Sequence, residues 1–225
     1  QINPTVYLEH FEACLQKGED VLYLCLTSGV SGTFQTASLC AAELQEKYPE
    51  GKVICIDSLC ASVGEGFLVR EAARKQKEGL TLDELVQWVN DHRQKVCHWF
   101  TVDDLNHLKR GGRINAATAL FGTMLAIKPV MHVDDEGRLI PVSKARGRKA
   151  SLTALVDRME ATAIDPAGQT VFISHGDCLE DAEFVAGEVR RRLGVETVHI
   201  NYVGPVIGNH SGPGTMALFF LGSER

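Results

Sequence analysis

The chain has 225 residues, of which 44% are hydrophobic and 23% charged, and its formal net charge at pH 7 is −6. This length suffices for one large domain or two small ones with a substantial core, and we favour two. The negative charge argues against nucleic-acid binding, because such domains carry a basic face that neutralises phosphates. No apolar run reaches membrane-spanning length and no basic-then-apolar leader opens the chain, so we expect a soluble, cytoplasmic protein.

The seven cysteines are odd in number, lie mostly within apolar patterns and form no C-x-x-C pair. This usage favours reduced thiols in the core over disulfides or zinc, and we expect no metal site. Cys178 follows closely after His175, which leaves a Cys/His nucleophile open. That spacing does not by itself aim a base at the thiol.

A loop of small and hydroxyl-bearing residues, 27–33 (TSGVSGT), lies between the apolar run 21–26 and a segment with apolar residues at helical spacing. This order predicts a strand, a loop and a helix. The amides at a helix N-terminus favour a bound anion, so Ser31 and Gly32 are candidates for holding a carboxylate or phosphate. The alternative is that Ser31 only caps the helix.

The same order of elements recurs in residues 52–78, where a β-branched strand is followed by a second small-residue loop and a helix. Two such units in succession imply a parallel sheet with both loops at its carboxyl edge, which would bring Ser62 near Ser31. Thr81 and Glu84 form a capping box that starts a further helix. We place the domain boundary in the polar stretch that follows, so that the first domain comprises residues 1–95.

The second domain, residues 96–225, contains six predicted strands of mixed direction with helices packed against them. Two of these strands pair as a hairpin in which Gly137 supplies the positive φ of the turn. Asp177 and Glu180 are predicted to form another capping box. The strands are predicted at residues 98–102, 127–133, 138–145, 170–174, 197–202 and 216–221.

Residues 204–215 (GPVIGNHSGPGT) place four glycines and two prolines around His210, just before the last predicted strand. A loop this constrained holds something in place. His210 is therefore a candidate ligand-binding residue, and the alternative is a loop histidine bonded to a carbonyl group.

This motif and four others together closely resemble the DegV family of bacterial fatty-acid-binding proteins. The others are TSGVSGT, LKRGGRI at 108–114, IKP at 127–129 and HGD at 175–177. The resemblance implies a Rossmann-like parallel α/β/α domain joined to a smaller α/β domain with a mixed six-stranded sheet. The family pattern also includes an earlier strand and helix, and a Thr-Ser pair before the position of Gln1, which this chain does not contain. That threonine would be a further ligand.

In such proteins a long-chain fatty acid lies with its carboxylate at the domain junction and its tail in a tunnel of the second domain. Some members hand the acid to a separate ATP-dependent kinase that phosphorylates the carboxyl group. Carried over by position, the resemblance assigns the carboxylate to Ser31, with the amides of its loop at Gly32, and to His210, and we add Ser62 because it is expected near Ser31. The small residues after Asn115 leave room for an alkyl chain, so we expect the tunnel wall at Ala116, Ala119, Phe121 and Ile127. The small residues among these are also compatible with ordinary helix packing.

A basic cluster stands out in this acidic chain and comprises Arg138, Lys144, Arg146, Arg148 and Lys149. The resemblance places Arg146 and Arg113 near the mouth of the site, where cations would face the kinase and the acyl-phosphate. The alternative for both arginines is solvated surface charge.

The leading interpretation is a lipid carrier that performs no chemistry and needs no cofactor. A palmitate-sized tail would contribute on the order of 10 kcal/mol, at about 0.8 kcal/mol per buried CH₂, before ordering costs. The rivals are a hydrolase using Cys178 and His175, and a small-molecule kinase, because the implied fold is similar to that of dihydroxyacetone kinase subunits. The sequence shows neither a Walker loop nor an acidic cluster for magnesium. A transcriptional regulator would need a recognition helix or a basic face, which the sequence also does not show.

Overall fold

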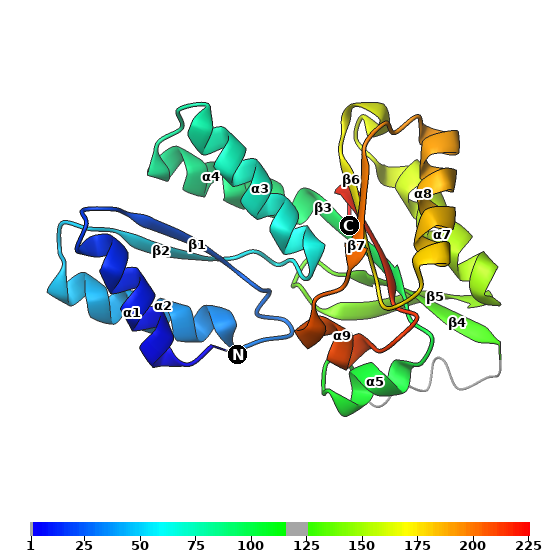
Figure 1. Ribbon diagram of the computed structural model, residues 1–225, viewed down its shortest axis with the longest axis horizontal. Helices are drawn as coiled ribbons and strands as arrows, with labels where there is room; N and C mark the ends of the chain where they lie inside the picture. Colours follow the sequence, from blue (N-terminus) through cyan, green and yellow to red (C-terminus); the bar gives the residue numbers. More distant parts are fainter. Residues whose placement is uncertain (1, 116–125) are drawn as a thin grey trace. The chain divides into compact units, whose positions relative to one another are not determined.

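The computed structural model describes residues 2–115 and 126–225. The chain divides into two compact units, drawn in Figure 1. Unit 1 comprises Gln1–Ala61 and Glu65–Arg93, and unit 2 comprises Ser62–Gly64 and Gln94–Arg225. The short segment Ser62–Gly64 therefore belongs with the C-terminal part of the chain.

Unit 1 is built on two parallel strands, β1 (Val21–Cys25) and β2 (Val53–Asp57), as the repeated strand–loop–helix pattern predicts. Helices α1 (Pro4–Leu15) and α2 (Thr33–Lys47) pack against them through a common core. Helices α3 (Val63–Lys77) and α4 (Leu82–His92) form a second pair. The core with α1 and α2 consists of Tyr7, Phe11, Leu15, Cys25, Ala37, Cys40 and Leu44.

Local signals in the sequence set the ends of these helices. The Asn3 side chain accepts a hydrogen bond from the Val6 amide at the start of α1, where Pro4 occupies the first turn. At α4 the predicted capping box is confirmed, because Thr81 Oγ1 accepts from the Glu84 amide and the Glu84 carboxylate accepts from the Thr81 amide.

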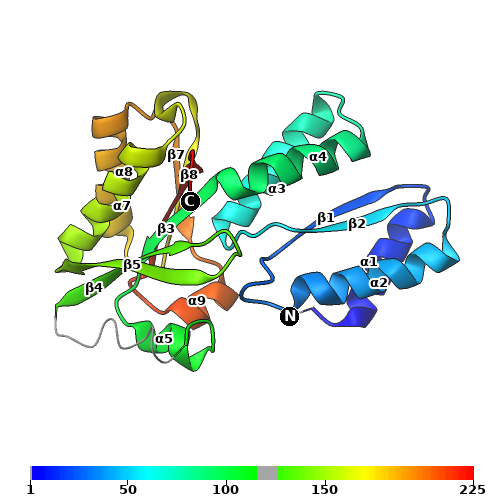
Figure 2. The same ribbon diagram turned by 180° about the vertical axis from the view of Figure 1, so that it is seen from behind.

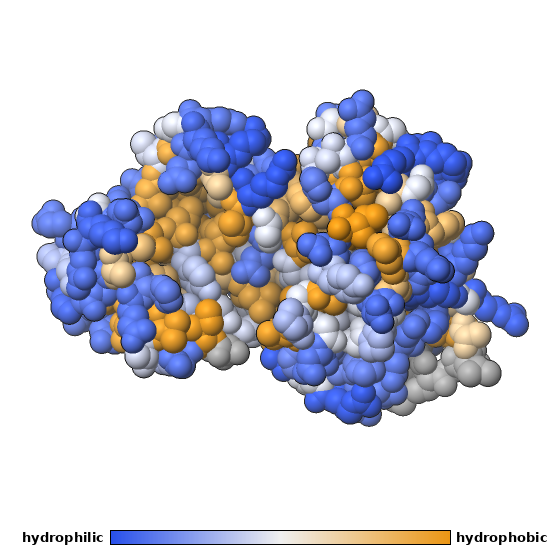
Figure 3. Space-filling model, viewed as in Figure 1, coloured by the Kyte–Doolittle hydropathy of each residue, from blue (hydrophilic) through white to orange (hydrophobic). Residues whose placement is uncertain are grey.

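Apolar side chains gather in the band between α1–α2 and α3–α4, along the two strands of unit 1 (Figure 3). Val21, Leu22 and Tyr23 of β1 are only half-buried. The parallel strands therefore keep part of their apolar surface accessible.

Unit 2 contains the predicted mixed sheet of six strands, in the order β5-β4-β3-β8-β6-β7. Only β6 and β7 pair in parallel among these neighbours; the other pairs are antiparallel. The strands are β3 (Val96–Thr101), β4 (Ile127–Val133), β5 (Leu139–Arg146), β6 (Val171–His175), β7 (Val198–Tyr202) and β8 (Met216–Leu221). The described helices are α5 (Leu105–Arg110), α7 (Arg148–Thr162), α8 (Leu179–Leu193) and α9 (Pro205–Ser211).

The two faces of this sheet have different partners. Helices α7 and α8 cover one face, where Leu155, Met159 and Val185 pack against Trp99 and Leu218 (Figures 1 and 2). We call the opposite face the apolar sheet face. It is formed by Phe100, Met131, Leu139, Phe172, Ala217 and Phe219, and α5 contributes Leu105 and Leu108 to the same cluster.

Two local predictions in unit 2 are wrong. The motif around His210 is not a loop throughout, because Pro205–Ser211 forms the short helix α9, which begins with proline and ends at Gly212. The capping box at Asp177 does not form: the N-cap of α8 is Cys178, whose amide donates to His175 Nδ1 at 3.2 Å. The hairpin prediction is confirmed, and Gly137 has a φ of +75°.

Candidate ligand-binding site

The loop after β1 is tied to the loop after β2 by backbone and carboxylate contacts. The Thr27 amide donates to the Cys60 carbonyl at 2.9 Å. The Ser28 and Leu59 amides both donate to Asp57 Oδ1, at 3.1 and 3.0 Å. Asp57 therefore fixes both loops at the carboxyl edge of the parallel strands. Our sequence interpretation missed this role, although an acidic residue ending a buried strand was a signal for it.

The hydroxyl of Ser31 lies at the start of α2, one residue before the N-cap Gly32. Ser31 Oγ accepts a hydrogen bond from the Thr33 amide at 3.3 Å and lies 2.8 Å from Thr33 Oγ1. Ser31 thus accepts from the first amide of α2, but it is not the N-cap that the alternative predicts, because the N-cap is Gly32. When Thr33 donates within the hydroxyl pair, the Ser31 proton is available to an anion.

In unit 2, the segment Ser62–Gly64 packs onto the apolar sheet face. Ser62 has a φ of +55°, and its Oγ lies 3.4 Å from the Oγ of the buried Ser174 on β6. Val63 packs against the apolar cluster itself. A Cβ on Gly64 would lie 2.0 Å from His98 Nε2, so this glycine allows the chain to approach the sheet closely.

His98 lies among these apolar side chains as a neutral imidazole. Its Nδ1 lies 2.8 Å from the Val96 carbonyl, so that this nitrogen carries the proton, and its ring meets Phe219 edge to face. Burial, and to a smaller degree the charge of Arg225, lower the pKa of His98 to about 3. His98 is a structural residue of β3 that also supports the Ser62–Gly64 segment.

His210 belongs to α9, which lies beside α5 (Figure 2). A Cβ on Gly111 would lie 2.3 Å from His210 Nδ1. Arg113 donates from Nη1 to the Gly111 carbonyl. Burial, and then the positive charge of Arg113, lower the pKa of His210. The structure therefore brings together two of the predicted site residues, His210 and Arg113.

The open end of the β4–β5 hairpin places Arg146 opposite Ile127 in the register. Strand alternation puts Ile127 on the same face of the sheet as Met131, and paired residues share a face. Arg146 is exposed and thus lies beside the apolar sheet face. The other predicted tunnel residues, Ala116, Ala119 and Phe121, lie outside the described residues.

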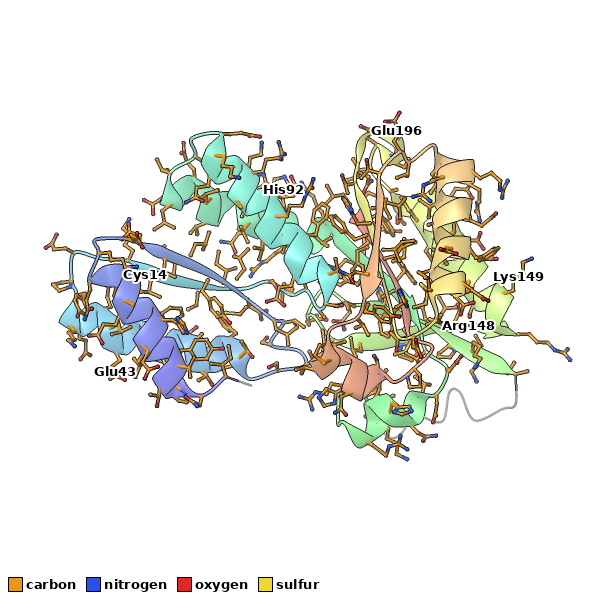
Figure 4. All side chains as sticks on the ribbon, in the orientation of Figure 1. Cys14, Glu43, His92, Arg148, Lys149 and Glu196 are labelled. Atoms are coloured by element: carbon orange, nitrogen blue, oxygen red, sulfur yellow. The ribbon has the colours of Figure 1, made fainter. Side chains whose placement is uncertain are left out.

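Most of the basic cluster is engaged in structural contacts. Arg148 and Lys149 open α7, where Figure 4 labels them. Arg148 forms ion pairs with Asp181 at 2.8 Å and Asp103 at 3.5 Å, whereas Lys149 lies over the Phe184 ring. Arg138 pairs with Asp134 and Glu136 in the hairpin turn. Lys144 and Arg146 are both exposed on β5, and of these two the predicted site residue is Arg146.

The geometry does not support a Cys178–His175 nucleophile. His175 Nδ1 accepts the backbone amide of Cys178, and the thiol donates to the Thr215 carbonyl at 3.3 Å. Burial raises the pKa of the thiol despite the nearby charge of Arg148. The group is a thiol held in place by a carbonyl, and not an activated thiolate.

Among the described residues, no set of three or more His, Cys, Asp or Glu is arranged to hold a metal ion. Within the same residues, no helix combines the length and the hydropathy needed to cross a membrane. All seven cysteines are free thiols.

Three known proteins illustrate what the chain is similar to. A DegV domain-containing protein of Clostridium perfringens is 44% identical over 225 residues, which is 100% of this chain and 77% of that protein. A structure from Thermus thermophilus, described as fatty acid binding of a DegV family protein, is 30% identical, with a TM-score of 0.86 over 97% of this chain and 76% of that one. The fatty acid kinase (Fak) B3 protein of Streptococcus pneumoniae, loaded with linoleic acid, shares the fold at 22% identity, with a TM-score of 0.87 over 98% and 76%.

The model of the DegV family matches residues 1–223, which is almost the whole chain. The family suggested by the glycine-rich motifs is therefore confirmed. So is the fold class, with its parallel strands and its mixed six-stranded sheet. On the sequence match and the shared fold, this chain belongs to the DegV family.

Proposed function

We propose that this protein binds a long-chain fatty acid non-covalently and performs no chemistry on it. The observation that carries this conclusion is the likeness to the Thermus thermophilus protein, which is described as binding fatty acid and shares the fold over 97% of this chain at 30% identity. Two features of the chain support it. One is the hydroxyl-bearing loop at the start of α2, and the other is the apolar sheet face next to the helix that contacts His210.

The carboxylate ligands in this proposal are Ser31, Gly32, Ser62 and His210. A carboxylate removed from water needs hydrogen-bond donors, because an unpaired buried charge is very costly. Ser31 can supply a hydroxyl proton while it accepts from Thr33, and His210 can supply a ring N–H. Ser62 adds a hydroxyl beside Ser174.

The tail would lie along the apolar sheet face, with Ile127 at one end of the face. Ala116, Ala119 and Phe121 complete the proposed wall. The face contains the aromatic side chains Phe100, Phe172 and Phe219. Burial of a palmitate-sized tail contributes on the order of 10 kcal/mol before ordering costs, so we expect the tail to dominate affinity and the carboxylate to set depth.

We further propose that the protein presents its fatty acid to a separate ATP-dependent fatty acid kinase in the cytoplasm. Arg113 and Arg146 would be the cations that face the kinase and the new acyl-phosphate. Arginine suits this role because its planar fork binds phosphate oxygens in pairs. The fold shared with the fatty acid kinase B3 protein of Streptococcus pneumoniae agrees with this proposal.

Binding can be tested by removing lipid from the purified protein and titrating it with palmitate, with palmitoyl-CoA as the competing ligand. We expect saturable binding of one fatty acid per chain and no comparable binding of the thioester. A protein that binds the thioester or sugar phosphates, but no free fatty acid, would refute the proposed function.

A further inference from the structure

Helices α5 and α9 contact each other through two histidine–glycine pairs. His210 on α9 lies against Gly111, which is the C-cap of α5. In the reverse direction, His107 on α5 lies against Gly212, the C-cap of α9, where a Cβ would come within 2.6 Å of the His107 ring. The histidine of each helix thus packs against the C-cap glycine of the other helix.

We propose that this reciprocal histidine–glycine contact positions the His210 ring for the carboxylate, so that Gly111 and His107 are positioning residues of the binding site. The contact itself is a property of unit 2. Its role in ligand binding rests on the proposed function.

The reason for a glycine at position 111 is space and not backbone conformation. Gly111 has φ −72° and ψ −9°, which any L-residue adopts. A Cβ there would nevertheless lie 2.3 Å from His210 Nδ1. Alanine at this position would therefore leave the backbone unstrained and displace the ring. Gly212 differs, because its φ of +82° requires glycine regardless of space.

Gly111 cannot easily move away from the ring. Its amide donates to the His107 carbonyl at 3.0 Å, and its carbonyl accepts from Arg113. His107 is itself oriented, because its Nδ1 lies 3.2 Å from Arg110 Nη2, which can only donate. Gly111, the two arginines that flank it and the two histidines are therefore connected through a series of contacts.

The position of the ring can be measured without any ligand. Partial burial and the charge of Arg113 lower the pKa of His210. The ionisable groups that α5 contributes to this contact are His107 and Arg110. A ring pushed toward water and away from Arg113 would regain a pKa near the usual 6.5. An NMR titration of the imidazole Cε1–H signals reports this change, with the signal assigned by its loss in His210→Ala.

The test compares Gly111→Ala with Gly204→Ala. Gly204 is the N-cap at the other end of α9, has φ −58°, and has open space where a Cβ would be added. We expect Gly111→Ala to raise the pKa of His210 and to weaken fatty-acid binding about tenfold. Gly204→Ala should change neither. His107→Ala, which empties the space beside Gly212, should shift the pKa of His210 in the same direction by less.

A double-mutant comparison separates positioning from a general loss of structure. In the His210→Ala background, Gly111→Ala should cost no further affinity, because no ring remains to be displaced. An equal cost in both backgrounds, or an unchanged His210 pKa in Gly111→Ala, would overturn the positioning role. A shifted pKa in a protein that binds no fatty acid, even as wild type, would overturn the proposed function while leaving the helix contact intact.

Discussion

The hydroxyl of Ser31 and the imidazole of His210 are the two side chains that we expect to contribute most to holding the carboxylate. Ser31→Ala removes one donor from a buried anion and should weaken fatty-acid binding by about 1–3 kcal/mol, and His210→Ala by a similar amount. Isothermal titration with palmitate measures both. Ser38→Ala, a change of the same kind further along α2, is the control and should bind as wild type does. Wild-type affinity in both site variants would place the carboxylate elsewhere.

The pH dependence of binding should identify His210 as a carboxylate ligand. Burial and Arg113 lower its pKa in the free protein, whereas a bound carboxylate favours the charged imidazolium and raises it. Binding therefore takes up a proton, and affinity should increase as the pH falls from about 7.5 to about 5.5. In His210→Gln this increase should be smaller. The carboxyl group of the ligand titrates alike in both proteins, so identical pH profiles would contradict the assignment.

His98 should make the protein sensitive to acid. Its pKa is about 3 when folded, against an ordinary 6.5, so between these values the unfolded chain binds the extra proton. The contribution of neutral His98 to the free energy of unfolding is fully present above pH 6.5 and decreases as the pH falls toward 3. Between pH 7 and pH 5 we expect wild type to lose about 2 kcal/mol of unfolding free energy relative to His98→Gln. If urea unfolding gave the same pH dependence for both proteins, the pKa of His98 would not be lowered by folding.

At the scale of elements, the β4–β5 hairpin presents Arg146 next to the apolar sheet face. An exposed cation makes little contact with a buried tail, so Arg146→Ala should keep fatty-acid affinity within about threefold. It should sharply reduce acyl-phosphate formation by a fatty acid kinase, and rising salt should weaken the wild-type encounter. Arg190→Ala, at an exposed position of α8, is the matched control. Equal phosphorylation of all three proteins across a salt series would leave Arg146 as surface charge.

The strands were predictable because their apolar runs are short and bounded by turn residues, and because some of them, such as β2, are rich in β-branched residues. The six strands of unit 2 and the parallel pair of unit 1 follow from that pattern. Helix α9 was not predicted, because the four glycines and two prolines of residues 204–215 favour a loop, whereas the helix packs against α5. The capping box at Asp177 does not form because the N-cap is Cys178, whose amide donates to the His175 ring and not to a carboxylate.

The sequence could indicate which residues belong to the candidate site, but not which of them contact each other. The motif around His210 is visible in the sequence, but the Gly111 contact joins segments about 100 positions apart and depends on how α5 packs on α9. The role of Asp57 likewise depends on the pairing of two loops. Sequence patterns report periodicity and turn chemistry, and they do not report which two helix ends meet.

At the scale of the whole molecule, the chain combines a small parallel α/β unit with a larger unit whose sheet has one face covered by α7 and α8 and another that is mainly apolar and aromatic. We expect the bound acid to stabilise the protein as a whole. At a free ligand concentration of 100 times Kd, the gain is about 2.7 kcal/mol, provided that the unfolded chain does not bind. Thermal unfolding with and without palmitate, followed by fluorescence, should show the rise in Tm. An unchanged Tm at saturating ligand would contradict it.

The most direct measurement is native mass spectrometry of the protein purified from a bacterial host. We expect a complex of one chain with one added mass equal to a long-chain fatty acid, which is released on denaturation and identified by its mass. After removal of the lipid, palmitate should restore the complex at one molecule per chain. Protein that carries no fatty acid, and that takes up none when palmitate is added back, would contradict fatty-acid binding as the function of this protein.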